Sequence, residues 1–192
     1  MVVRRTVVTA DHDEFEREKL MTNTNSIEVS LTIAESAHTI FEILASPQRH
    51  HEFDGSDMLR GTVVASRLRE VGDTFTMKMH RLGRDYIMVN HVVEFEEDRR
   101  IIWAPAPGDL DTAGGDPARI GVPAGYRWGY TLIPHNDEST EVKELFDCGT
   151  EANRWILERD GGSWINGSST IVDNMTATLA RLAALCGRDG KP

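Results

Sequence analysis

Six segments with the composition of β-strands follow one another between residues 59 and 148. The segments are residues 59–66, 73–80, 86–96, 100–104, 126–134 and 140–148. Turn sequences such as Leu82-Gly83-Arg84 separate most of them. Strands with short connections pair antiparallel, because a parallel pair needs a crossover of about a dozen residues or more. The sequence therefore predicts an antiparallel meander.

A further strand and two short helices are expected before the meander. Residues 27, 29, 31 and 33 are apolar and alternate with polar residues, which is the pattern of a half-buried strand. Ser36 can cap a following helix, and Pro47 prevents that helix from continuing. A second short helix or turn is expected over residues 48–53. With the six later segments, the predicted sheet has seven strands.

A long helix is expected at the C-terminal end. Its apolar residues recur at spacings of three and four, so that one stripe of the helix must be buried. These residues are Val172, Met175, Leu179, Leu182 and Cys186. Gly187 is placed to end the helix. Between the sheet and this helix, residues 150–159 are expected to form a short helix that Gly161-Gly162 breaks.

Residues 105–123 contain four prolines and four glycines, which predicts a long irregular loop. Loops of this length in a compact domain are often functional or mobile.

Composition narrows the classes of partner. The 192 residues carry a formal net charge of -10, which leaves no broad basic surface for nucleic acid or for an anionic membrane. No apolar run approaches the length of a membrane span or of a signal peptide. Cys148 and Cys186 lack metal-site spacing and suit a reducing compartment. We therefore expect a cytoplasmic protein, monomeric or homodimeric, without an integral membrane association.

The first 25 residues are expected to form an extension to the domain. Three interpretations remain open for residues 1–21: a mobile segment, a short helix over residues 13–20, or an upstream start with Met21 as the physiological first residue.

The order of elements resembles the START-like, or Bet v 1-like, superfamily (SRPBCC), which includes polyketide cyclase/dehydrase and lipid-transport proteins of bacteria. The resemblance covers about residues 26–186. It is carried by the opening segment IEVSLTIAESAHTIFEILASPQRHHEFDGS, by the late hairpin GYRWGYTLIPHNDESTEVKELF and by the last helix. Many relatives have tryptophan where this chain has Phe53.

The resemblance implies an α+β helix-grip fold, in which a curved seven-stranded antiparallel sheet wraps a long C-terminal helix around a cavity for a hydrophobic ligand. It implies one ligand-binding domain over residues 26–187, with residues 188–192 as a tail. It implies no single chemistry, because the scaffold serves binders, carriers, cyclases and aromatase-type enzymes without a shared catalytic motif.

Residues that share a strand or helix face with the apolar pattern are the candidates for the cavity wall. Methionines suit a deformable apolar pocket, and tyrosine and tryptophan add flat surfaces with a polar atom. The predicted pocket residues are Phe75, Met77, Met79, Val89, Trp103, Tyr126, Trp128, Tyr130, Phe146, Met175 and Leu179.

Two ionisable residues lie in phase with apolar neighbours on their strands. His91 shares its alternation with Val89 and Phe95, and Glu144 shares its alternation with Phe146. If both line the pocket, His91 is a candidate for proton transfer and Glu144 for orienting it. A structural histidine in a hydrogen bond is the alternative. His50-His51-Glu52 and Asp54 have no recognised metal spacing, so no metal or other cofactor is expected.

Three functions remain open from the sequence. The first is binding, or transport, of a small hydrophobic or aromatic metabolite or lipid. The second is a cofactor-free cyclase or dehydratase that uses the same pocket. The third is a protein-interaction or regulatory module with a vestigial pocket, for which a fully packed interior would be expected.

Overall fold

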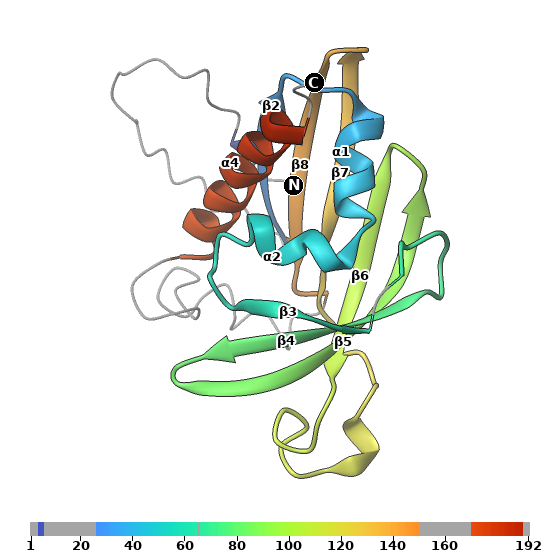
Figure 1. Ribbon diagram of the computed structural model, residues 1–192. Coiled ribbons are helices and arrows are strands. Elements are labelled where there is room, and N and C mark those ends of the chain that lie inside the picture. Colours follow the sequence, from blue (N-terminus) through green and yellow to red (C-terminus); the bar gives the residue numbers. More distant parts are fainter. Residues whose placement is uncertain (1–3, 6–25, 65, 150–169, 190–192) are drawn as a thin grey trace.

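The computed structural model describes residues 4–5, 26–64, 66–149 and 170–189 (Figure 1). Seven antiparallel strands form one curved sheet in the order β2-β8-β7-β6-β5-β4-β3. Their bounds are β2 Ser26–Ile33, β3 Leu59–Val64, β4 Thr74–Arg81, β5 Arg84–Glu96, β6 Arg100–Pro107, β7 Arg127–Asn136 and β8 Ser139–Asp147. The predicted α+β helix-grip fold, with its seven strands and C-terminal helix, is confirmed.

Part of the N-terminal extension adds to the edge of this sheet. The two-residue strand β1, Arg4–Arg5, pairs parallel with Glu28 and Val29 of β2. The remaining interpretations of residues 1–21 concern positions outside the described residues, as does the helix expected over residues 150–159.

Two short helices and one helical turn follow β2. Helix α1, Ala37–Leu44, begins where the Ser36 Oγ accepts a hydrogen bond from the Thr39 backbone N–H at 3.1 Å, as the capping pattern predicts. Pro47 starts the turn η1, Pro47–Arg49, and α2 spans His50–Phe53. The predicted pair of short helices is therefore present.

The C-terminal helix α4, Ile171–Asp189, packs against β2, β8 and α2. In Figure 1 it lies on the same side of the sheet as α1 and α2. Met175, Leu179, Leu182 and Cys186 are buried, as the helical spacing predicts. Gly187 does not end the helix: it lacks the positive φ that a terminating glycine adopts, so the helix continues to Asp189.

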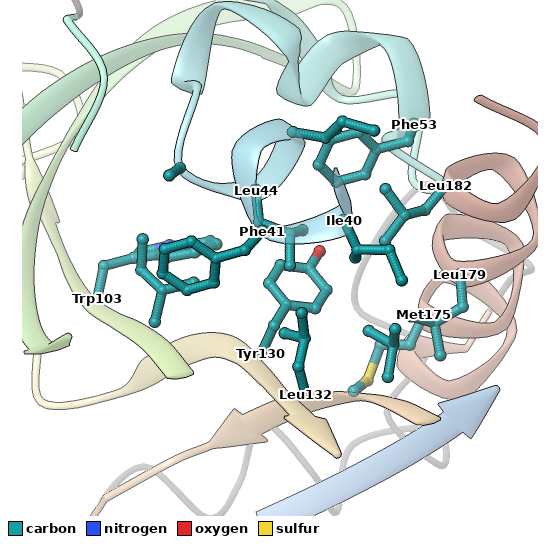
Figure 2. Packing of buried hydrophobic residues seen from close by; sticks show 14 of the residues in the cluster. Ile40, Phe41, Leu44, Phe53, Trp103, Tyr130, Leu132, Met175, Leu179 and Leu182 are labelled. Carbon is teal, nitrogen blue, oxygen red and sulfur yellow. The ribbon is translucent and has the colours of Figure 1, made fainter. Parts of the chain in front are cut away.

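The core lies between the sheet and these helices. Phe41 of α1 contacts Phe95 of β5 edge to face, with ring centroids 5.4 Å apart. Figure 2 shows Tyr130 and Leu132 of β7 reaching from the sheet toward Ile40 and the α4 residues.

A bulge in β5 changes which residues face this core. The pairing of β5 with β6 shifts register between Val92 and Glu94. Before the bulge, Met88, Asn90 and Val92 are buried; after it, Phe95 packs against the core. One extra residue therefore reverses the alternation within a single strand.

Strand β6 runs three residues further than the sequence predicts, through Pro105 to Pro107. This end of β6 pairs with β5, while its ladder with β7 stops at Trp103. The carbonyls of Pro105 and Pro107 accept hydrogen bonds from Ala124 and Gly121 of the long loop. Because these prolines turn their nitrogens away from β5, they remove no ladder hydrogen bond.

Candidate functional site

A cavity of about 630 Å³ lies between the concave face of the sheet, α2 and α4. Pockets that hold small molecules have volumes of a few hundred to about 1,000 Å³. Its wall is mainly apolar. The aromatic and methionine side chains are Phe53, Met58, Met77, Met79, Tyr86, Met88, Trp103, Tyr126, Trp128, Tyr130 and Met175.

Seven of the predicted pocket residues line this cavity. They are Met77, Met79, Trp103, Tyr126, Trp128, Tyr130 and Met175. Phe75, Phe146 and Leu179 are buried in the hydrophobic core without lining the cavity. Phe75 contacts Trp103 and Phe146 contacts Trp128, with centroids 5.5 Å and 4.5 Å apart. These phenylalanines therefore support the two tryptophans that form the wall.

Val89 and His91 do not reach the cavity, which corrects the expectation for both. The residues of β5 that line it are Tyr86, Met88 and Asn90, so their neighbours in the alternation point to the opposite face of the sheet. The prediction assumed that every second residue before Phe95 faces the core. That alternation is broken because the bulge lies between His91 and Phe95. His91 and Glu144 are consequently not brought together, and Nε2 of His91 has no hydrogen-bond partner among the described residues.

Methionine is the most frequent flexible residue of the wall. Five of the seven methionines line the cavity, and two of them, Met77 and Met88, are cross-strand partners on β4 and β5. Unbranched thioether chains change rotamer easily, which lets a wall adapt to an irregular apolar ligand. The sequence patterns did not identify Met88, because of the bulge, or Met58, which lies in the turn before β3.

His50 is a cavity residue that the sequence suggested only as a possible metal ligand. Its Nε2 lies 2.7 Å from the Leu44 carbonyl and must donate to it, so in the neutral ring Nδ1 is the acceptor. The ring stacks on Trp103 with centroids 5.5 Å apart. Burial lowers the pKa of His50 to about 4, which keeps the ring neutral at physiological pH. In the described part of the chain, no three potential ligand side chains come together around a metal site.

Glu144 is a carboxyl group in an apolar wall. It lies opposite Tyr130 across the β7–β8 pair, and the Tyr130 hydroxyl donates to its Oε1 at 3.3 Å. Oε2 has no hydrogen-bond partner among the described residues. Burial raises the pKa of Glu144 well above its ordinary value and also raises that of Tyr130. Burial therefore favours the protonated form of Glu144. The Tyr130 hydroxyl already donates to Oε1, so the carboxyl proton of Glu144 is the donor available to a further partner.

Asn174 and Thr178 bring polar atoms from α4 to the same cavity. The Thr178 Oγ1 accepts a hydrogen bond from the Gly55 backbone N–H at 2.9 Å, which attaches the turn after α2 to the helix. The Asn174 Nδ2 is buried and lacks a hydrogen-bond partner within the described ranges.

Replacing Glu144 by glutamine is expected to change how stability depends on pH. In the unfolded chain the carboxyl group ionises above about pH 4.5, whereas in the folded protein its raised pKa keeps it protonated to a higher pH. The wild type therefore loses about 1.4 kcal/mol of unfolding free energy per pH unit from this group as the pH rises above that value. Glu144→Gln has no such loss, so its stability relative to the wild type should increase with pH.

Urea denaturation of both proteins at pH 5, 6 and 7 measures this difference. Glu138→Gln removes a carboxyl group from an exposed turn and is the matched control. A constant difference between Glu144→Gln and wild type over this range would show that Glu144 is ionised in the folded protein.

Comparison with known proteins supports the fold and gives no activity. No family model matches the chain. The uncharacterized protein Rv0088 of Mycobacterium tuberculosis is 28% identical over 118 residues, which cover 62% of this chain and 45% of that protein. Uncharacterized protein MT0096, from a second strain, is 29% identical over the same length. The matched segment thus spans slightly less than half the length of these curated relatives.

Solved structures share the architecture at low identity. Protein Ms6760 from Mycobacterium smegmatis has a TM-score of 0.61 and 16% identity, with 87% of this chain and 94% of that chain covered. A protein from Arthrobacter aurescens has a TM-score of 0.62 and 12% identity, with 97% and 95% covered. At these identities the likeness shows the fold alone. Among the described helices, none is long and apolar enough to cross a membrane.

Proposed function

We propose that this protein binds a small hydrophobic or aromatic metabolite, or a lipid, in its internal cavity. The observation that carries the proposal is the cavity of about 630 Å³, which aromatic rings and five methionines line. The cavity is partly open to solvent, so a ligand can enter it, and its size lies within the range of small-molecule sites. A ligand that removes apolar surface from water there gains roughly 25 cal/mol per Å² buried.

Titration with the neutral fluorescent probe N-phenyl-1-naphthylamine tests the proposal. One probe molecule should bind per chain, and Trp128→Leu should weaken binding by about tenfold because the indole is part of the wall. Leu110→Ser and Val122→Ser change exposed apolar residues outside the cavity and should leave binding unchanged. Failure of the probe to bind, or equal effects of the cavity and surface variants, would refute the proposal.

An enzyme that acts in the same pocket is the second candidate. Glu144 and Tyr130 form a buried hydrogen-bonded pair in which burial favours the protonated carboxyl group, and such a donor can polarise a carbonyl group. The sequence pattern favoured His91 as the base for this reaction, and His91 faces away from the cavity. The geometry thus supports a role for Glu144 as an acid or donor and gives no support to the His91–Glu144 pair.

The third candidate, a protein-interaction module with a vestigial pocket, requires a filled interior. The cavity therefore favours ligand binding over that alternative.

A further inference from the structure

Two buried residues of the cavity wall each have a polar atom without a hydrogen-bond partner among the described residues. These atoms are Oε2 of Glu144 and Nδ2 of Asn174, whose side chains are 5% and 7% exposed. A buried polar atom without a partner destabilises a fold by about 1–3 kcal/mol. Two such atoms in one cavity wall indicate that a bound molecule supplies the missing partner.

The two residues come from elements that are in contact. Glu144 lies on β8 between Val29 of β2 and Tyr130 of β7, and α4 packs against both β2 and β8. In Figure 2 the Tyr130 hydroxyl points from the sheet into the space enclosed by α1, α2 and α4. The sheet side and the helix side of the cavity thus each provide one polar atom without a partner.

Both atoms are donors. Oε1 of Glu144 already accepts the Tyr130 hydroxyl, so the carboxyl proton belongs on Oε2. Nδ2 of Asn174 carries two hydrogens. The complementary group on a ligand is therefore an acceptor, and an ammonium group, which can only donate, would meet donors at both positions.

We propose that the cavity takes a neutral, ring-bearing molecule with a carbonyl group, whose oxygen accepts hydrogen bonds from Glu144 and Asn174. This inference rests on the proposed function and adds the chemical class of the ligand. Charged residues, namely Asp54, Arg81 and Arg84, also line the cavity. A neutral group suits the buried surroundings of Glu144 and Asn174, because an ion there would lose most of its hydration.

A matched pair of probes tests the inference: 1-acetylpyrene, which has a ketone, and 1-ethylpyrene, which has the same rings without it. The wild type should bind the ketone about tenfold more tightly, as a net gain from one or two hydrogen bonds predicts. Asn174→Leu and Glu144→Met, which remove one donor each at similar size, should reduce this preference to about twofold or less. Glu144→Gln should keep it, because its amide still donates.

Two readouts separate recognition from folding. The carbonyl stretching frequency of bound 1-acetylpyrene should fall in the wild type relative to an apolar solvent and should rise again in Asn174→Leu. Asn174→Leu should also be at least as stable as the wild type without ligand, because it removes a buried atom that lacks a partner. Glu144→Met is expected to be less stable, because it leaves the buried Tyr130 hydroxyl without its acceptor.

Equal binding of the two probes by the wild type would overturn the inference and leave the proposed function intact. Tighter binding of 1-(pyren-1-yl)ethylamine than of the ketone, lost in Glu144→Gln, would also overturn it, because Glu144 would then act as a carboxylate. Failure of every probe to bind would overturn the proposed function together with the inference.

Discussion

Replacing Met77 and Met88 by tryptophan should abolish most ligand binding and leave the fold intact. These residues are cross-strand partners, and both side chains line the cavity. Two indole groups at these positions would occupy space that the ligand needs, and an existing void can accept them with less strain than a packed core. The affinity for N-phenyl-1-naphthylamine should fall on the order of 100-fold, which corresponds to about 2.7 kcal/mol.

The matched control is Met77→Leu with Met88→Leu. Leucine conserves volume and apolar character, so the control should bind within about threefold of the wild type. Circular dichroism and thermal unfolding establish that both double variants are folded. If the tryptophan variant is folded and binds the probe as tightly as the wild type, the probe site lies elsewhere.

Replacing Gly55 by alanine should destabilise the protein by about 3 kcal/mol. A Cβ atom at this position would lie 2.2 Å from the Asn174 carbonyl oxygen and 2.4 Å from the Thr178 backbone nitrogen. Both contacts are with the main chain of α4, so a side-chain rotation cannot relieve them. The turn after α2 would have to move away from α4 and would lose the hydrogen bond from Gly55 to Thr178.

Gly187→Ala is the control for Gly55→Ala, since a Cβ atom added to Gly187 of α4 would meet no neighbouring atom within 4 Å. Alanine there should stabilise the protein by roughly 0.5–1 kcal/mol, because a helical glycine loses more backbone entropy than alanine on folding. Urea denaturation measures both changes. A loss below about 1 kcal/mol for Gly55→Ala would contradict the close packing of α2 against α4.

The regular parts of the fold followed from the sequence because their periodicity reports burial directly. The Ser36 cap and the α4 stripe through Met175 and Leu179 are local patterns of this kind. The placement of Tyr130 and of Glu144 in phase with apolar residues on their own strands is another such pattern, whereas their pairing with each other was not predicted. Seven of the predicted pocket residues line the cavity for the same reason.

The incorrect predictions concern residues whose orientation depends on the strand or loop they pair with, which the local sequence does not show. The bulge near Val93 arises between β5 and β6 and leaves no local sequence signal, so the phase assigned from Phe95 placed Val89 and His91 on the wrong face. Pro105 and Pro107 marked a loop in the sequence, yet they fit β6 because their nitrogens face away from β5. His50 contacts Trp103, which is distant in the sequence, and no periodicity predicts that contact.

Native mass spectrometry of the protein with N-phenyl-1-naphthylamine tests the central claim, that the cavity is a binding site for an apolar ligand. The wild type should form a one-to-one complex, and the variant with tryptophan at positions 77 and 88 should form none. Absence of a complex with the wild type, or an equal complex with both proteins, would contradict a ligand site in the cavity.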